Sequence, residues 1–415
     1  MAALMKVETE GAYSNITLNA ALRGTDLSDR DKALAAGLFY GVLDRKITLD
    51  YALARQMKTP LKKLQPYTLT VLRTALYQIL YMDKIPDSAA VNEAVKAVRA
   101  SRESRNAGFV NAVLRNLLRQ GVILPDGKDT AALSVRYSCP EWIVRSFCED
   151  YGAETAENLL KESLKPAPTV LRVNTLKTSA EELIQAFGER GVPVERGRLP
   201  GSLVLLKGIE IAEDPLFRDG WFHAEDEASQ YAVSLLAPRP GDRVLDLCAA
   251  PGGKSFTMAQ WMENQGELLS CDLYPARVEL IRGGAKRLGL TVLSAAVADA
   301  TVYDHDRGEF DDVLCDVPCS GLGVLRRKPD IKYRPESEVA DLPALQYTIL
   351  ENAAKYVKRG GKLLYSTCTL RRTENEAQIE RFLKEHHEFQ KRNERSLMPH
   401  MDKTDGFYCA LLEKE

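Results

Sequence analysis

The sequence lacks three features that would place it in a special class of proteins. No apolar run approaches the roughly 20 residues of a membrane-spanning helix, and residues 1–10, MAALMKVETE, lack the apolar core of a secretion signal. None of the eight cysteines forms the C-x-x-C pair that is common in structural zinc sites. We therefore expect a cytoplasmic protein with reduced cysteines, no membrane partner and no metal.

The net charge of the whole chain is close to zero, but the charge is unevenly distributed along the sequence. The 415 residues hold 56 Lys and Arg against 58 Asp and Glu, and the net charge of −2 alone would argue against a nucleic-acid partner. Residues 1–124, however, hold 18 basic and 11 acidic side chains, a net of +7, so the remainder carries −9. A length of 415 residues and 45% hydrophobic content predict about three globular domains. A basic front region is thus joined to an acidic back region.

The front region has the pattern of successive helices. Over residues 27–120, apolar residues recur at three- and four-residue intervals, and Ser28, Pro66 and Pro86 mark helix starts. The predicted helix at 104–120 and its approach carry a set of arginines and asparagines: Arg102, Arg105, Arg115, Arg119, Asn106, Asn111 and Asn116. Two interpretations of this face stay open, a phosphate-binding surface and a merely solvated one.

The back region changes character twice. Residues 121–140 look like a linker, and a mixed stretch follows, with helices at 140–151, 153–163 and 179–190 and strands at 170–174 and 203–206. From residue 242, short apolar strands alternate with helices, which predicts a doubly wound, mostly parallel sheet. The expected strands of that sheet are 243–247, 267–272, 292–297, 312–315 and 361–366.

The first expected strand of the sheet leads into a glycine-containing turn, DLCAAPGGKS, at residues 246–255. Gly252 and Gly253 let the backbone approach a ligand at the carboxyl end of a strand, where open α/β sheets bind ligands. The glycine spacing is neither that of a dinucleotide turn nor that of a phosphate loop. A pyrophosphate-binding site is therefore disfavoured, and with it a dehydrogenase.

Acidic residues follow the next three strands: Asp272, Asp299 and Asp316. Any one of them is most simply a helix N-cap. Their repetition at successive strand ends suits a cofactor with ribose hydroxyls, an amine and a positive charge. S-adenosylmethionine has these groups.

Two cysteines are expected at the same edge of the sheet. Cys319 follows the fourth strand in a Pro-Cys pair, and Cys368 follows the fifth in a Thr-Cys pair. A thiolate beside a methyl donor suits methylation of a pyrimidine carbon, because thiolate addition to carbon 6 makes carbon 5 nucleophilic. A base must then remove the proton from carbon 5 so that the thiolate can leave.

The runs DLCAAPGGKS, DVPCSGLGVLRRKPDIKYR and YSTCTL resemble the motifs of RNA cytosine-5 methyltransferases. The runs LSDRDKALAAGLFYGVL and NAGFVNAVLRNLLR are similar to the NusB-like RNA-binding domain of the RsmB/Sun family of bacterial 16S ribosomal RNA methyltransferases. The resemblance covers nearly the whole chain. It implies an all-α NusB-like bundle over 1–125, a linker and small α+β region over 126–235, and a Rossmann-like α/β methyltransferase domain over 236–415.

The resemblance also implies an activity and its residues. The enzyme would act as a monomer and transfer a methyl group from S-adenosylmethionine to carbon 5 of a cytosine in 16S rRNA, either naked or within a small-subunit assembly intermediate. Cys368 would be the nucleophile, and Cys319 would assist product release. Asp316 would hydrogen-bond the polar edge of the cytosine, and Lys254 would orient either the base or the cofactor. The implied cofactor positions are Cys248, Ala249, Ala250, Pro251, Gly252, Gly253, Lys254, Asp272, Arg277, Asp299 and Asp316.

A basic run follows the Pro-Cys pair. Residues 321–335 carry five basic side chains against one acidic side chain, Asp330, and we expect them to attract RNA phosphates. The five are Arg326, Arg327, Lys328, Lys332 and Arg334.

Two alternatives to the implied activity stay open. One is a catalytically inactive RNA-binding factor, although the presence of Cys319 and Cys368 argues against it. The other is a DNA or tRNA cytosine methyltransferase. DNA enzymes use the Pro-Cys cysteine as nucleophile, so the additional Thr-Cys pair favours RNA.

Overall fold

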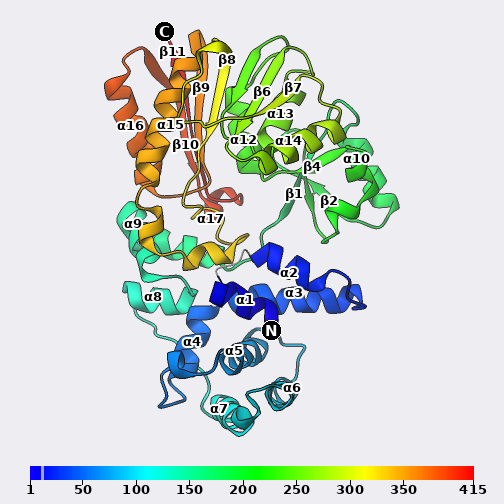
Figure 1. Cartoon of the computed structure of the whole chain (residues 1–415), viewed down its shortest axis with the longest axis vertical. Helices are drawn as coiled ribbons and strands as arrows, with labels where there is room; N and C mark the ends of the chain where they lie inside the picture. The colour runs from blue at the N-terminus through cyan, green and yellow to red at the C-terminus, as the bar shows by residue number, and fades with distance from the viewer. Residues whose placement is uncertain (11–13) are drawn as a thin grey trace. The chain divides into compact units, whose positions relative to one another are not determined.

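A computed structural model describes residues 1–10 and 14–415, which form two compact units (Figure 1). The helical unit contains Met1–Lys165 together with the segment Leu325–Arg334, and the sheet unit contains Pro166–Val324 and Pro335–Glu415. Within the described ranges, no helix is long and apolar enough to cross a membrane. The three-part division at residues 125 and 235 stays a prediction.

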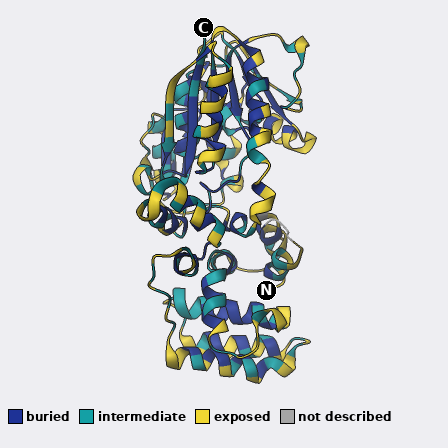
Figure 2. Cartoon of the chain, turned by 90° about the vertical axis from the view of Figure 1, so that its left-hand side faces the viewer, coloured by how far each residue is buried: buried dark blue, intermediate teal, exposed yellow. Residues whose placement is uncertain are grey.

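The helical unit confirms the helices predicted for the front region. Ser28 caps its helix by accepting a hydrogen bond from the Asp31 backbone N–H, and Pro66 is the first residue of its helix. The α-helices of this unit are α1 (Ala2–Glu10), α2 (Ser14–Leu22), α3 (Asp29–Asp44), α4 (Lys46–Ala54), α5 (Pro66–Tyr81), α6 (Asp87–Arg99), α7 (Ala107–Gln120), α8 (Thr130–Tyr137) and α9 (Glu141–Ser163). The apolar faces of α1 to α7 meet in one core, which includes Leu72 of α5 and Leu114 of α7. Figure 2 shows the buried faces of these helices in dark blue.

Two details of this unit bear on the sequence predictions. The linker predicted at 121–140 is wrong in part, because residues 130–137 form α8. Asp129, which looks like a loop residue, is the N-cap of α8 and accepts a hydrogen bond from the Ala132 backbone N–H. The expected break between helices 140–151 and 153–163 is present inside α9, where Gly152 has a φ of +78°.

The sheet unit begins with a small antiparallel sheet in the order β2-β3-β1-β4. Its elements are β1 (Thr169–Val173), α10 (Ala180–Glu189), β2 (Val194–Arg196), β3 (Ser202–Leu205), α11 (Pro215–Arg218) and β4 (Phe222–Ala224). The predicted strands at 170–174 and 203–206 are β1 and β3. The short strands β2 and β4 escaped prediction, because three residues are too few to establish a strand pattern.

A second sheet follows, in the order β10-β11-β9-β8-β5-β6-β7. The neighbouring strands β9, β8, β5, β6 and β7 are parallel to one another, as predicted. The other two strands are antiparallel: β11 pairs with β9, and β10 pairs with β11. Its elements are α12 (Glu227–Leu236), β5 (Arg243–Asp246), α13 (Gly253–Trp261), β6 (Glu267–Asp272), α14 (Pro275–Leu288), β7 (Leu293–Val297), β8 (Phe310–Asp316), α15 (Leu342–Tyr356), β9 (Val357–Thr367), α16 (Glu376–Glu385), β10 (Phe389–Leu397), α17 (Pro399–Asp402) and β11 (Phe407–Lys414).

Both faces of the central strands of this sheet are buried. Successive residues of β5 alternate between two cores: Val244 packs with helices α12 to α14, and Leu245 packs with α15 and α16 (Figure 1). Burial on both sides explains why the central strands are continuous apolar runs in the sequence. The carboxyl ends of β5, β6, β8 and β9 carry the residues predicted to form the site.

Candidate active site

The turn after β5 requires glycine. Gly252 has a φ of +114°, and a Cβ at this position would clash with the ring of Phe256. The turn borders a cavity of about 180 Å³. The cavity is lined by Ala224, Glu225, Asp226, Ser229, Asp246, Cys248, Ala249, Ala250, Pro251, Gly253, Lys254 and Asp316. Most of the residues that the sequence places in the glycine turn therefore face one small cavity.

Two buried carboxylates face this cavity and were missed by the sequence predictions. Ser255 donates a 2.6 Å hydrogen bond to one oxygen of Asp246, and Thr257 donates a 2.5 Å bond to one oxygen of Glu225. Within the described residues, the other oxygen of each carboxylate has no hydrogen-bond partner. Burial raises the pKa of Asp246 to about 7. Acceptors of this kind suit the hydroxyl and ammonium groups of a small polar ligand.

Asp272 and Arg277 brace the same turn from β6 and α14. Asp272 accepts a 3.3 Å hydrogen bond from the Ala250 backbone N–H, and Arg277 donates a 2.8 Å bond to the Ala250 carbonyl. An Arg277 nitrogen also lies 3.4 Å from an Asp272 oxygen. These two side chains therefore hold the turn in shape, although neither lines the cavity.

Asp299 lies elsewhere. It is exposed, and it accepts hydrogen bonds from the backbone N–H and the hydroxyl of Thr301, which lower its pKa. It lines a separate hollow that includes Tyr303 and His305, not the cavity at the glycine turn. The structure thus brings together Asp246 and Asp316 in that cavity, with Asp272 behind it and Asp299 apart.

A partly buried ion pair lies at the end of β8. Lys254 Nζ donates a 2.7 Å hydrogen bond to Asp316, and Ser366 of β9 donates a 2.7 Å bond to the other Asp316 oxygen. Burial alone would lower the pKa of Lys254, but its interactions with Asp316, Glu225 and Cys368 outweigh burial and raise it. Lys254 therefore stays an ammonium group beside the cavity.

The two predicted cysteines meet at this edge. They follow β8 and β9, which are neighbouring parallel strands, and the Sγ atoms of Cys319 and Cys368 lie 3.3 Å apart. The hydrogen bond with Cys368, together with burial, raises the pKa of Cys319 well above that of a free thiol. Cys319 is therefore a neutral thiol at neutral pH and can hydrogen-bond to its neighbour.

A buried polar network holds the loops that carry these cysteines. The fully buried Glu374 accepts 2.9 Å hydrogen bonds from the Ser320 backbone N–H and from the Gln346 side chain. Gln346 also donates to the carbonyl of Pro318, the residue before Cys319. No motif in the sequence pointed to Glu374 or Gln346, because their role depends on loops that are distant along the chain.

The basic run at 321–335 is only partly available to RNA. Lys328 and Arg334 are exposed, but Lys332 has no exposed surface and its Nζ pairs with Asp44 of α3. The prediction that Lys332 faces phosphates is therefore wrong. Its neighbours Pro329 and Ile331 are also buried, so this part of the run packs inside the helical unit.

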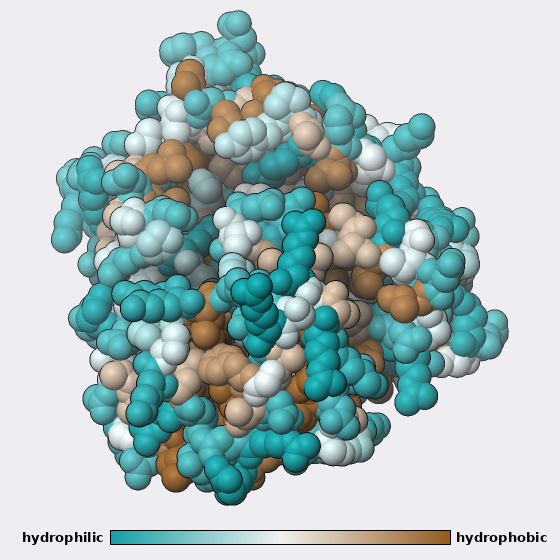
Figure 3. Space-filling view, turned by 60° about the horizontal axis from the view of Figure 1, so that its bottom comes forward, coloured by the Kyte–Doolittle hydropathy of each residue, from teal (hydrophilic) through white to brown (hydrophobic). Residues whose placement is uncertain are grey.

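The arginines predicted on the last front helix are all exposed: Arg102, Arg105, Arg115 and Arg119. Two of them are held by asparagines of α7, since Arg115 donates to Asn111 at 3.0 Å and Arg119 donates to Asn116 at 2.6 Å. Figure 3 brings this end of the helical unit forward, and hydrophilic side chains project over much of the visible face. The guanidinium groups are accessible to an anionic partner.

Comparison with known proteins identifies the family. Residues 233–413 match the 16S rRNA methyltransferase RsmB/F family, residues 1–119 the NusB family, and residues 139–212 the RsmF/B-like methyltransferase ferredoxin-like domain. A probable ribosomal RNA small subunit methyltransferase B of Bacillus subtilis is 39% identical over 100% of this chain and 97% of its own length. The counterpart from Serratia proteamaculans is 32% identical over 94% of this chain and 92% of its own.

Solved structures share the fold of this chain. The crystal structure of PH0851 has a TM-score of 0.85 and 27% identity, covering 99% of this chain and 97% of that one. NSun6 from Pyrococcus horikoshii, solved with the S-adenosylmethionine analogue SFG, shares the fold with a TM-score of 0.62 and 22% identity over 66% of this chain and 98% of its own. The chain belongs to the RsmB/Sun family of S-adenosylmethionine-dependent rRNA methyltransferases.

Proposed function

We propose that this enzyme methylates carbon 5 of a cytosine in 16S rRNA through a covalent adduct with Cys368. The observation that carries the proposal is the 3.3 Å approach of the Cys319 and Cys368 Sγ atoms beside the Lys254–Asp316 pair. Methylation at an exocyclic oxygen or nitrogen needs no thiol, whereas an aromatic carbon needs a nucleophile to activate it. Two thiols at one cofactor edge fit the second chemistry.

The cavity at the glycine turn fits S-adenosylmethionine. The unpartnered oxygens of Asp246 and Glu225 can accept hydrogen bonds from its hydroxyl or ammonium groups, and the acidic lining suits its positive charge. Gly253 lines the cavity without a side chain, and a Cβ there would lie 3.2 Å from the unpartnered Glu225 oxygen. When bound, S-adenosylmethionine supplies an electrophilic methyl group.

Cys368 performs the first step. Its thiolate adds to carbon 6 of the cytosine, the Sγ–C6 bond forms, and the electron pair of the C5–C6 double bond moves to carbon 5. The ammonium of Lys254 is close enough to interact with the charge on Cys368 and favours the thiolate form. Asp316, held by Lys254 and Ser366, can accept a hydrogen bond from the polar edge of the base.

Cys319 assists the last step. Once carbon 5 carries the methyl group, a base must take its proton, and a solvent water molecule can do so. The C–H electron pair then re-forms the C5–C6 double bond, and the Sγ–C6 bond breaks with its electron pair on the Cys368 sulfur. The Cys319 sulfur lies 3.3 Å from the Cys368 sulfur, which is the leaving group of this step. We assign it to product release and not to nucleophilic attack.

The RNA must present an unstacked base to Cys368. Unstacking costs a few kcal/mol, and the cost is smallest in a loop or single-stranded region. Exposed basic side chains on α7 and at Lys328 and Arg334 supply phosphate contacts that are independent of sequence. We therefore propose a loop cytosine of 16S rRNA as the target, bound by a monomer.

The decisive experiment separates the two cysteines. Cys319→Ala incubated with 16S rRNA and S-adenosylmethionine should accumulate a protein–RNA adduct that survives a denaturing gel, because the sulfur of Cys368 cannot leave. Cys368→Ala should form no adduct, and its methyl transfer should fall by at least about 1000-fold. Cys148→Ala, which removes a half-buried thiol from α9, is the matched control and should behave like the wild type.

The position of methylation is read independently by bisulfite sequencing of rRNA from cells with and without the enzyme. Loss of one non-converted cytosine in 16S rRNA supports the proposal. Methyl transfer by Cys368→Ala at the rate of the wild type would overturn the nucleophile assignment, and a methyl group found on any atom other than carbon 5 would overturn the reaction.

A further inference from the structure

The segment Leu325–Arg334 connects the two compact units in an unusual way. The chain leaves the sheet unit at Val324, packs in the helical unit from Leu325 to Arg334, and returns to the sheet unit at Pro335. Leu325 comes only six positions after Cys319. A stretch that the sequence presents as an active-site loop is thus built into the helical unit.

The segment is anchored by buried polar contacts. Lys332 has no exposed surface, and its ammonium pairs with Asp44 at the end of α3. The hydroxyl of Tyr333 donates a 2.5 Å hydrogen bond to the Leu43 carbonyl. Ser14 of α2 donates a 3.0 Å bond to Asp330. A lysine is rarely buried without a partner, because removing its charge from water is costly.

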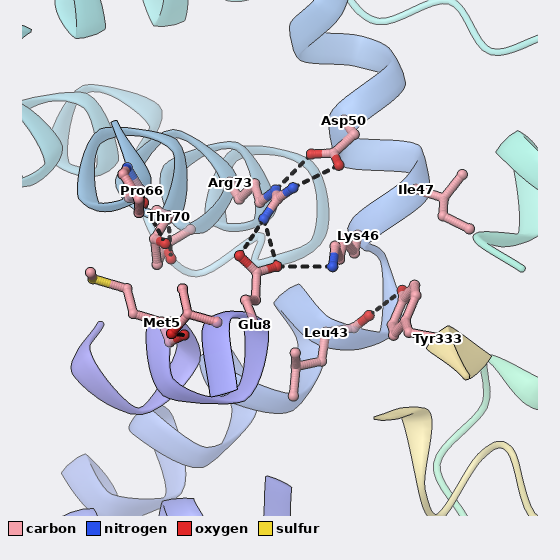
Figure 4. A network of polar contacts seen from close by, with 12 residues as sticks. Met5, Glu8, Leu43, Lys46, Ile47, Asp50, Pro66, Thr70, Arg73 and Tyr333 are labelled. Atoms are coloured by element: carbon pink, nitrogen blue, oxygen red, sulfur yellow. Dashed lines mark hydrogen bonds and ion pairs between the residues drawn. The ribbon is translucent and has the colours of Figure 1, made fainter. Parts of the chain in front are cut away.

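The anchor continues into the core of the helical unit (Figure 4). Lys46 at the start of α4 lies 4.8 Å from the centroid of the Tyr333 ring and 3.2 Å from Glu8 of α1. Glu8 and Asp50 in turn bind Arg73 of α5, each at 2.6 Å. The polar network that ties α1, α4 and α5 together therefore also holds Tyr333.

At its other end the segment is joined to the nucleophile. The Gly323 backbone N–H donates a 3.0 Å hydrogen bond to the Cys368 carbonyl, and its carbonyl accepts a 2.9 Å bond from the Gly406 N–H. A Cβ at Gly323 would clash with the Gly406 carbonyl, so this approach requires glycine. Only Val324 separates Gly323 from the anchored segment.

We infer that the helical unit positions the catalytic loop, and that Lys332 is a positioning residue for methyl transfer. The catalytic loop is residues 319–324, which begin at Cys319 and include Gly323, the residue that binds the Cys368 carbonyl. Lys332 touches neither cysteine. It acts on this loop through the backbone that joins Leu325 to Gly323. The inference rests on the proposed function for its account of Cys368. It goes beyond RNA binding, because it gives the helical unit a part in catalysis after the RNA is bound.

The test compares two lysines of the same segment. Lys332→Met leaves Asp44 without its partner and should free the segment, so kcat should fall about 10-fold while KM for rRNA stays within about 2-fold. Lys328→Met removes an exposed charge and should do the opposite, raising KM with kcat unchanged. Hydrogen exchange of the backbone amides in residues 319–324 should accelerate in Lys332→Met only.

A double variant separates positioning from charge. Lys332→Met/Asp44→Leu replaces both members of the ion pair by apolar side chains. Such a replacement is often neutral for stability, because no charge is left buried without a partner. The double variant should therefore recover most of the kcat that Lys332→Met loses. If Lys332→Met does not fold, Tyr333→Phe takes its place, since it loses only the hydrogen bond to the Leu43 carbonyl and should lower kcat about 3-fold.

The outcomes are separable from those of the proposed reaction. Wild-type kcat together with wild-type exchange in residues 319–324 of Lys332→Met, or of Tyr333→Phe where it replaces that variant, would overturn the inference. If the wild-type enzyme makes no 5-methylcytosine, the proposed reaction fails, but the exchange measurement still decides whether the helical unit holds the loop.

Discussion

Two lysine–aspartate pairs, one in each unit, differ in how far they are buried and have different consequences. Lys254 pairs with Asp316 in the sheet unit, and Lys332 pairs with Asp44 in the helical unit. The first pair borders a cavity whose acceptor oxygens on Asp246 and Glu225 have no partner among the described residues. Its lysine also interacts with Cys368. The second is surrounded by packed side chains, among them Ile331 and Tyr333.

The comparison teaches how to assign a buried ion pair. A buried pair is weak support for stability by itself, because the cost of desolvation offsets much of the attraction. The two aspartates are similarly exposed, Asp316 at 28% and Asp44 at 20%, and the pairs differ in their lysines. Lys254 is 13% exposed and borders a cavity, whereas Lys332 has no exposed surface. From the surroundings of each pair, we assign Lys254 a role in the reaction and Lys332 a role in positioning the segment Leu325–Arg334.

Within this comparison of the two pairs, the largest expected effect comes from breaking the pair in the sheet unit. Lys254→Met removes the ammonium beside Asp316 and Cys368, so kcat should fall about 100-fold, as for loss of one preorganised electrostatic group. Its melting temperature should change by no more than about 2 °C, since water can solvate the partly exposed Asp316. Single-turnover methyl transfer and thermal unfolding measure the two effects.

Lys332→Met is the counterpart in that comparison. Its melting temperature should fall by several degrees, because Asp44 loses a fully buried partner. Equal losses of stability in the two variants, or a normal kcat in Lys254→Met, would remove the distinction between the two pairs.

A smaller effect should follow from the protonation of Asp246. Burial raises its pKa to about 7, so below pH 7 the carboxyl is neutral and attracts a cationic ligand less strongly. Affinity for S-adenosylmethionine should therefore rise as pH increases, with a slope of up to about 10-fold per unit below pH 7, and level off above it. Calorimetric titration between pH 5.5 and 8.5 measures this dependence.

Asp246→Asn should bind weakly at every pH and lose the dependence. Asp219→Asn, which changes an exposed carboxylate in the same unit, is the control and should keep it. A pH dependence that persists in Asp246→Asn would assign the titration to another group of the cavity.

Much of the sheet could be predicted because its strands are buried on both faces. Val244, Leu245 and their neighbours form apolar runs, and the glycine turn marks where β5 ends. The prediction missed β10, whose middle is exposed and charged and whose pattern resembles a loop. It also missed β11, a buried strand at the end of the chain that follows no helix–strand alternation.

The site divides in the same way. The sequence brought Cys319, Cys368, Lys254 and Asp316 to one edge because parallel strands share their carboxyl ends. It could not reveal that Lys332 is buried, because its partner Asp44 is 288 residues away along the chain. Glu225 lies before the first strand of the large sheet, outside every motif, and only the folded chain places it at the cavity.

The smallest expected effect concerns the exposed face of α7. Arg115→Gln/Arg119→Gln removes two charges that asparagines hold in place, without disturbing the core of the unit. If this face contacts phosphates, rRNA binding should weaken a few-fold, and the slope of log Kd against log salt should decrease by about 1 to 2. Fluorescence anisotropy at several salt concentrations measures the slope.

The matched control lies on the neighbouring helix. Lys96→Gln/Arg99→Gln removes the same charge from α6, so a long-range effect of net charge would appear equally in both variants. A change confined to the α7 variant assigns phosphate contacts to that face. Equal slopes in both variants and the wild type would mean that the α7 arginines only keep the helix solvated. The RNA-binding part of the helical unit would then lie on another face. The proposed positioning of the catalytic loop by the helical unit does not depend on this result.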